Sequence, residues 1–121
     1  MCKRILVVDD DPSIAEAISL TLEEEGYTVQ TLHDGKKVWD KVGVWPPDVI
    51  ILDILMSGHD GREIARRLKA HHATQRIPIV ISSAHPHGAT MAQEAGADEF
   101  LAKPFDISSL LDVVEKCAHT V

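Results

Sequence analysis

Runs of consecutive apolar residues are the most regular feature of the hydrophobic pattern. Ile5–Val8 and Val49–Leu52 contain no alternating polar residues, so they predict strands buried on both faces, as in the middle of a parallel sheet. Ile77–Ile81 predicts another buried strand, with its proline at the entrance. Tyr27–Thr31 alternates more and predicts an edge strand, and Glu99–Ala102 predicts a short final strand.

Helical patterns follow each of these strands. Asp11 before Pro12 predicts an N-cap and a first helical residue, and Gly26 predicts the end of that helix. The other predicted helices are a short one capped by Asp34, one begun by a capping box of Asp60 and Glu63, one over roughly residues 89–95, and one capped by Asp106.

Apolar spacing also predicts which helical side chains face the core. In the first helix the predicted inward residues are Ile14, Ala17, Ile18, Thr21 and Leu22. In the last helix they are Ile107, Leu111, Val114 and Cys117 or Ala118. Residues 54–61 have no such spacing and are predicted to form a loop.

Five strands alternating with five helices predict an α/β fold. We expect a three-layer, doubly wound (βα)5 arrangement with a parallel five-stranded sheet and right-handed crossovers. The 121 residues suit one domain with a single core, so we expect one domain over residues 1–121.

Composition narrows the class of protein. The formal net charge of −7 argues against nonspecific binding of nucleic acid or anionic membrane and suits a cation. The pattern predicts no membrane span and no signal peptide. Cys2 and Cys117 have no metal-site spacing and are predicted to be reduced thiols in a cytoplasmic protein. His71 and His72 lack partner ligands and are interpreted as helix-end residues rather than a metal site.

Polar residues follow four of the strands at the edge where open α/β sheets bind ligands. Asp9 and Asp10 follow the first strand, Asp53 the third, Ser83 the fourth and Lys103 the fifth. Each alone has a structural explanation as a cap, a turn residue or a surface group, so the prediction depends on their joint arrival. Converging carboxylates repel one another unless a cation such as Mg²⁺ neutralises them. The set suits phosphoryl transfer to Asp53, with the metal and the ammonium stabilising the charge.

The same motifs resemble the receiver domain of bacterial two-component response regulators. The resemblance covers nearly the whole chain, through Val7–Pro12, Ile50–Asp53, Ser83–Ala84 and Ala95–Phe105. It implies the flavodoxin-like strand order 2-1-3-4-5, which receivers share with flavodoxin itself. It also implies a signalling module rather than an enzyme, apart from its own phosphorylation and dephosphorylation.

The resemblance further implies a role for each site residue. Asp53 would be the phosphoacceptor, while Asp9, Asp10, Asp53 and the carbonyl of Leu55 would hold Mg²⁺. Lys103 would pair with the phosphate, and the bond to Pro104 would be cis.

Two more residues would form the switch. Phosphorylation would draw the hydroxyl of Ser83 inward, and Phe100 would rotate into the vacated space. That movement would repack the surface made by the fourth helix, fifth strand and fifth helix.

The implied partners are a sensor histidine kinase or phosphotransfer protein, and an output protein or an output domain outside this chain. No nucleic acid or membrane contact by this domain is expected, whereas a weak or phosphorylation-dependent dimer is compatible with it. Two alternatives stay open: a receiver that binds partners without phosphorylation, and a Mg²⁺-dependent phosphohydrolase. The hydrolase interpretation is weakened because Leu55 stands where such enzymes carry an acid/base aspartate.

The chain departs from the family pattern in several places. Ser57 and Gly58 replace the usual Pro-containing loop and predict greater loop mobility. The segment from Ser83 to Gly96 is short, which leaves the fourth helix uncertain. Leu55 and His85 occupy positions that tune phosphoryl lifetime; we hypothesise that apolar Leu55 slows hydrolysis, and an unchanged dephosphorylation rate in Leu55→Asn would refute this.

Overall fold

A parallel five-stranded sheet forms the centre of the computed structural model, which describes residues 3–56 and 59–119. The strands lie in the order β2-β1-β3-β6-β7, and every neighbouring pair is parallel. This confirms the predicted order 2-1-3-4-5, because β6 and β7 are the fourth and fifth strands of this sheet along the chain. Their bounds are β1 Arg4–Val8, β2 Thr28–Leu32, β3 Val49–Asp53, β6 Ile79–Ser83 and β7 Glu99–Ala102.

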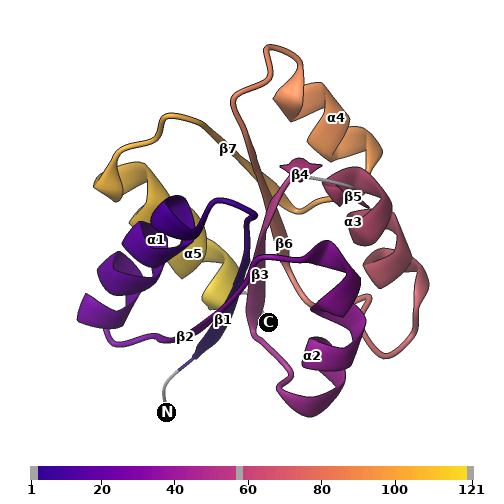
Figure 1. The fold of residues 1–121 in the computed structure, drawn as a ribbon, viewed down its shortest axis with the longest axis horizontal. Coiled ribbons are helices and arrows are strands. Elements are labelled where there is room, and N and C mark those ends of the chain that lie inside the picture. Colours follow the sequence, from indigo (N-terminus) through magenta and orange to yellow (C-terminus); the bar gives the residue numbers. More distant parts are fainter. Residues whose placement is uncertain (1–2, 57–58, 120–121) are drawn as a thin grey trace.

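Helices cover both faces of the sheet, as predicted (Figure 1). One layer consists of α1 and α5, and the other of α2, α3 and α4. Within the described ranges no helix meets the length and hydrophobicity needed to span a membrane. The helices are α1 Pro12–Glu24, the 3-10 helix η1 Gly35–Lys37, α2 Val38–Val44, α3 Gly61–Ala70, α4 Gly88–Glu94 and α5 Ile107–Ala118.

The helix starts follow the capping residues in the sequence. The carboxylate of Asp11 accepts hydrogen bonds from the backbone N–H of Ser13 at 2.9 Å and of Ile14 at 3.4 Å. Asp34 and Asp106 cap η1 and α5 in the same way. Since these side chains satisfy N–H groups that have no partner within the helix, they determine where each helix begins.

The capping box predicted for α3 forms only in part. Asp60 caps the helix by accepting from the N–H of Arg62 at 2.9 Å. The carboxylate of Glu63 lies 3.7 Å from the guanidinium of Arg66, one turn further along. Asp60 also pairs with the Arg62 side chain at 2.7 Å, which lowers the pKa of the Asp60 carboxyl.

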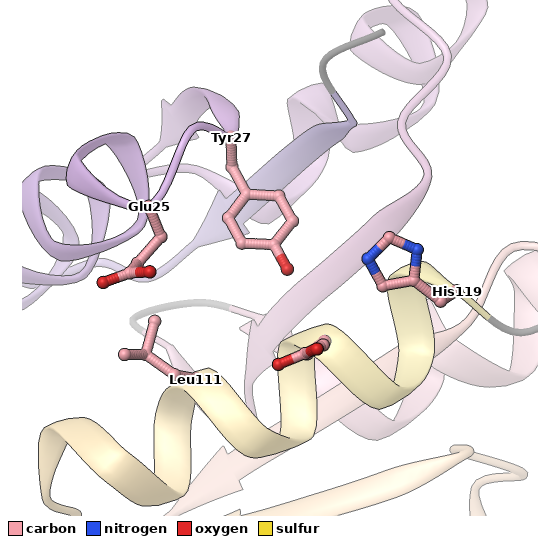
Figure 2. Close-up of a pocket in the computed structure, with 5 residues that line it drawn as sticks. Glu25, Tyr27, Leu111 and His119 are labelled. Carbon is pink, nitrogen blue, oxygen red and sulfur yellow. The ribbon is translucent and has the colours of Figure 1, made fainter.

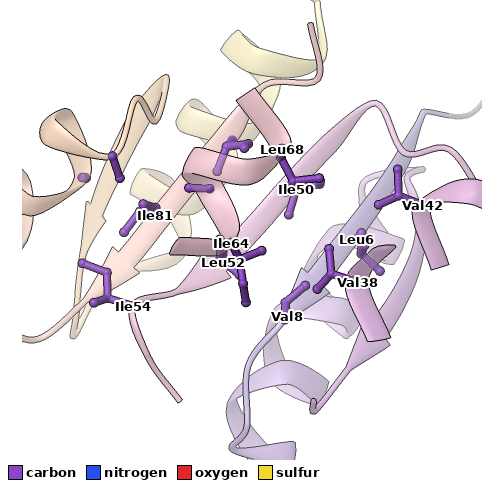
Figure 3. Close-up of a cluster of buried hydrophobic side chains, with 14 residues drawn as sticks. Leu6, Val8, Val38, Val42, Ile50, Leu52, Ile54, Ile64, Leu68 and Ile81 are labelled. Atoms are coloured by element: carbon purple, nitrogen blue, oxygen red, sulfur yellow. The ribbon is translucent and has the colours of Figure 1, made fainter. Parts of the chain in front are cut away.

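The core is divided by the sheet into two clusters. Figure 3 shows the cluster under α2, α3 and α4, where Leu6, Ile50 and Leu52 of the strands meet helical side chains. Alternate residues of the same strands, such as Ile51, pack under α1 and α5. Every residue of β3 is buried, because both of its faces are covered, and this confirms the prediction of a central strand.

Cys117 belongs to the cluster under α1 and α5. It is a free cysteine and is buried, and burial raises the pKa of its thiol to about 11. The buried thiol is therefore protonated near neutral pH, which suits the predicted reduced state. Cys2 lies outside the described residues.

Two predictions from the pattern are wrong in detail. Residues 54–61 are not only a loop, because β4 (Leu55–Met56) and β5 (His59–Asp60) form a short antiparallel pair. Ile107 is 63% exposed, and Ala17 is also exposed. Both line a hollow of about 290 Å³ between α1 and α5, so they sit where these helices leave a space rather than where they meet the sheet.

Charge is distributed unevenly between the two helical layers. The α1 and α5 segments together contain five carboxylates and one lysine. The η1, α2 and α3 segments together contain seven Lys or Arg residues and two carboxylates. The helices α1 and α5 are therefore net acidic, whereas η1, α2 and α3 are net basic.

Candidate functional site

Three carboxylates meet at the carboxyl edge of the sheet. Asp53 ends β3, while Asp9 and Asp10 follow β1, its neighbour in the sheet. One oxygen from each carboxylate lies within 4.8 Å of the other two. Asp9 and Asp53 are buried, and Asp10 is half-buried. The convergence predicted from the strand ends is therefore present.

Asp9 is held on several sides. One carboxylate oxygen accepts a hydrogen bond from the N–H of Asp11 at 2.9 Å, and the other pairs with Lys103 at 2.9 Å. Its backbone N–H donates to the carbonyl of Leu32, and its carbonyl lies 3.0 Å from Nδ1 of His33. These contacts fix the carboxylate beside Asp53 rather than leaving it free to turn outward.

Lys103 reaches the cluster from the end of β7. Its backbone N–H donates to the carbonyl of Ser83, and the bond to Pro104 is cis, as predicted. The ammonium lies 2.9 Å from a carboxylate oxygen of Asp9 and 3.5 Å from one of Asp53. Lys103 is predicted to pair with a phosphate on Asp53, whereas in the structure its ammonium is closer to Asp9.

The electrostatics of the cluster are incompletely balanced. Burial raises the pKa of Asp53, and the charges of Asp9 and Asp10 raise it further, against the opposing effect of Lys103. Among the described residues, Lys103 pairs with Asp9 and Asp53, and this pairing does not cancel the rise in the pKa of Asp53. Oxygen ligands of this kind suit a hard divalent cation such as Mg²⁺, so the residues present fit the predicted metal.

Ser83 and Phe100 lie on the two neighbouring strands β6 and β7. Ser83 is buried, and its hydroxyl oxygen accepts a hydrogen bond from the N–H of His85 at 3.0 Å. Phe100 is half-buried and packs against the cluster under α4. The first residue of α4, Gly88, is adjacent to both of them.

Gly61 is a site residue that the sequence pattern did not identify. It begins α3, and its N–H donates to the carbonyl of Ile54 at 2.8 Å. A methyl group at position 61 would overlap the backbone carbonyl oxygen of Asp53 and lie 2.9 Å from Cα of Ile54. Only glycine allows α3 to approach Asp53 this closely. The signal was present as a glycine directly after a capping aspartate, but its contact with Asp53 depends on the fold.

The loop after Asp53 is described only in part. The backbone of Leu55 pairs with Asp60 between β4 and β5, and the role of its carbonyl as a metal ligand stays a prediction. Its side chain is outside the described part of the structure, so its effect on hydrolysis also stays a prediction. Ser57 and Gly58 also lie outside the described residues.

Another hollow of about 240 Å³ lies between the end of α1 and α5, away from the three carboxylates. Figure 2 shows Tyr27 facing α5 across this hollow, with Glu25 and His119 at its sides. Burial raises the pKa of the Tyr27 phenol, and the charges of Glu115 and Glu25 raise it further. The hollow adds nothing to the chemistry at Asp53.

Comparison with known proteins agrees with this geometry. The response regulator receiver domain model matches residues 5–115. The chain is 37% identical over 110 residues to the DNA-binding dual master transcriptional regulator RpaA of Synechocystis, covering 89% of this chain and 46% of that protein. It is 36% identical over 113 residues to the response regulator MprA of Mycobacterium bovis, covering 92% and 48%. The chain thus spans about half the length of these curated relatives.

Solved structures show the same fold. The chemotaxis response regulator CheY4 of Vibrio cholerae superimposes with a TM-score of 0.88 at 29% identity, covering 97% of this chain and 99% of that one. The receiver domain of NtrX from Brucella abortus gives a TM-score of 0.89 at 30% identity, with coverage of 97% and 99%. With its acidic cluster, its flavodoxin-like strand order and a family match over nearly its whole length, the chain belongs to the receiver domains of two-component response regulators.

Proposed function

We propose that this chain is a phosphorylation-controlled signalling module that accepts a phosphoryl group on Asp53. The donor is the phosphohistidine of a sensor histidine kinase or of a phosphotransfer protein. A carboxylate oxygen of Asp53 attacks the phosphorus, the phosphorus–nitrogen bond breaks, and its electron pair returns to the imidazole of the donor. The convergence of Asp9, Asp10, Asp53 and Lys103 from three strands is the observation that carries this proposal.

The residues around Asp53 have separate tasks. Lys103 lies within 3.5 Å of Asp53 and stabilises the charge on the phosphoryl oxygens as they arrive. It can turn from Asp9 to the phosphoryl group without a large movement, since it already contacts both carboxylates. Ser83 accepts from the N–H of His85, which leaves its hydroxyl hydrogen to donate to a phosphoryl oxygen.

Asp9, Asp10, Asp53 and the carbonyl of Leu55 would hold the Mg²⁺. When bound, the ion supplies positive charge that offsets the three carboxylates and the incoming phosphoryl oxygens. The raised pKa of Asp53 supports a cation requirement, because the carboxylate must be ionised to act as a nucleophile.

The response to phosphorylation would pass through Ser83 and Phe100 to the surface formed by α4, β7 and α5. The relative RpaA is described as a DNA-binding transcriptional regulator, and this chain spans less than half of it. We infer that this surface contacts an output domain or an output protein, or a second receiver in a phosphorylation-dependent dimer. A phosphoryl group shifts the equilibrium between the two conformations of this surface only to the extent that they differ in their interaction energy with it.

The test is intact-protein mass spectrometry after incubation with acetyl phosphate and Mg²⁺. We expect a mass increment of one phosphoryl group that disappears in Asp53→Asn and after chelation of the metal. Asp112→Asn is the matched control, because Asp112 is an exposed carboxylate on α5, and this variant should be labelled like the wild type.

Two results would overturn the proposal. Without an increment in the folded wild-type protein, the chain would be a receiver that binds partners unphosphorylated. With steady turnover of a chromogenic phosphoester, it would be a phosphohydrolase.

A further inference from the structure

Gly88 lies where three parts of the switch meet. It is the first residue of α4 and is buried. A methyl group at this position would lie 2.8 Å from Cζ and 2.9 Å from Cε1 of Phe100. It would also lie 3.3 Å from Cβ of Ser83. The tip of the Phe100 ring therefore occupies space that a side chain at position 88 would need.

The backbone around Gly88 is tied to Ser83. The N–H of His85 donates to the hydroxyl of Ser83 at 3.0 Å, and the N–H of Gly88 donates to the carbonyl of His85 at 2.9 Å. Through His85, the start of α4 is connected to the serine by two hydrogen bonds. A displacement of Ser83 would consequently disturb the hydrogen bonds that position Gly88.

Phe100 is the most adaptable member of this group. It is half-buried, so its ring can turn toward solvent, whereas the backbone of Ser83 is fixed in the sheet by pairing with Ala102. Carbon atoms pack at about 3.5–4.0 Å, so a methyl group at 2.8 Å forces either the ring or α4 to move. Because only side-chain rotation is needed, the ring is expected to yield first.

We propose that Gly88 is a positioning residue of the switch: its missing side chain leaves the inward position, against α4 and beside Ser83, open to the ring of Phe100, so that the ring already populates this position without phosphate and phosphorylation raises that population. This inference deepens the proposed function, and its link to phosphorylation rests on that function. The aromatic ring and the first turn of α4 then act as one packed unit. The equilibrium between the inward and outward positions of the Phe100 ring then depends on the residue at position 88 as well as on the phosphoryl group.

The primary experiment measures the ring without any phosphate. Phe100 and Phe105 are the only phenylalanines, so the ring signals of Phe100 are readily assigned by NMR. In the wild type we expect nuclear Overhauser contacts from this ring to Gly88 and Ser83. In Gly88→Ala we expect the contact to Ser83 to be lost and the ring signals to move toward those of an exposed phenylalanine.

A matched glycine provides the control. Gly43 lies within α2, and no atom of the described residues outside its own helix is within 4 Å of the place where its methyl group would be. Gly43→Ala makes the same chemical change in a helix and should leave the Phe100 signals unchanged. Retention of the contact to Ser83 in Gly88→Ala would overturn the proposal, as would an equal loss in Gly43→Ala.

A second measurement tests the link to the phosphoacceptor. Coupling between two sites is reciprocal. A variant that shifts the ring outward must therefore lower the affinity for a phosphoryl analogue that favours the inward ring, on the order of fivefold or more. The probe is beryllofluoride with Mg²⁺, and Gly88→Ala combined with Phe100→Leu should recover much of the affinity because the smaller side chain leaves room for the methyl group. Failure of the double variant to recover affinity would show that the ring does not transmit the effect.

The outcomes separate this inference from the proposed function. Absence of Asp53 phosphorylation in the wild type would refute the proposed function but leave the ring measurement valid. If Gly88→Ala alone does not fold, the double variant decides: folding restored by Phe100→Leu supports the contact, and continued unfolding overturns it.

Discussion

The two helical layers of this receiver differ in how they are built. The α1/α5 layer consists of helices of 13 and 12 residues, and its core side chains, such as Leu22 and Val114, are fully buried. The opposite layer has α2 and α4 with seven residues each and α3 with ten. It approaches the site through glycines, Gly61 against Asp53 and Gly88 against Phe100.

This difference suggests a division of labour. Long helices with large apolar side chains contribute stability through burial, whereas short helices in close contact with the site are more easily displaced by it. A substitution in the α1/α5 core should therefore alter stability more than chemistry. A substitution at the glycines of the other layer, Gly61 or Gly88, should alter the chemistry at Asp53 as well as the stability.

The largest expected effect on stability comes from Leu22→Ala. Leu22 is fully buried near the end of α1, and truncation should lower the free energy of unfolding by about 3 kcal/mol. Labelling of Asp53 by acetyl phosphate should stay unchanged in the folded fraction. Urea unfolding and mass spectrometry measure the two quantities. A tenfold loss of labelling in folded protein would contradict the division between layers.

Gly61→Ala should affect both quantities. The added methyl group meets backbone atoms of Asp53 and Ile54 that cannot turn away, so we expect a stability loss of about 2 kcal/mol. Labelling of Asp53 should fall at least about tenfold, as expected when a reacting group is misplaced. If Gly61→Ala labels at the wild-type rate, the approach of α3 does not position the phosphoacceptor.

Asp53→Asn should stabilise the metal-free protein near neutral pH, because it removes a buried charge that the folded state disfavours. The pKa of Asp53 is raised in the folded protein, so the folded state favours the protonated carboxyl. Wild-type stability should therefore fall as the pH rises from the unfolded pKa through the folded pKa, and the variant should lack this loss. Thermal unfolding across pH measures the difference, and Mg²⁺ should stabilise the wild type more than Asp53→Asn. A variant less stable than wild type at neutral pH would contradict an unbalanced carboxylate cluster.

The smallest effect is expected from Gly43→Ala. The position is helical and open, so alanine should raise the free energy of unfolding by about 0.5 kcal/mol through its better helix propensity. Urea unfolding measures this gain. A loss of stability instead would mean that packing around position 43, rather than helix propensity, determines the contribution of this residue to stability.

Much of the architecture could be predicted because the decisive signals are local. Consecutive apolar residues identified Val49–Leu52 as a central strand, and capping side chains such as Asp11 marked helix starts. The carboxylate cluster followed from the rule that parallel strands end at one edge. The pair of β4 and β5 was missed because two-residue strands are too short to show a period.

Contacts made through the fold were less accessible. The roles suggested for Gly61 and Gly88 depend on what lies opposite an absent side chain, which spacing along the chain does not reveal. The closer pairing of Lys103 with Asp9 depends on distances of 2.9 and 3.5 Å within one cluster. Ile107 followed the helical period, yet it begins α5 at a point that borders a hollow.

The opposite charge of the two helical layers also has a consequence for long-range behaviour. With carboxylates on α1 and α5 and basic residues on η1, α2 and α3, these helices contribute an electric dipole across the sheet. An approaching charged protein therefore experiences a torque before any atoms touch, and a cationic surface is oriented toward α1 and α5. This pre-orientation weakens once the separation exceeds the Debye length, about 8 Å at physiological ionic strength, so encounter rates should decline as salt is added.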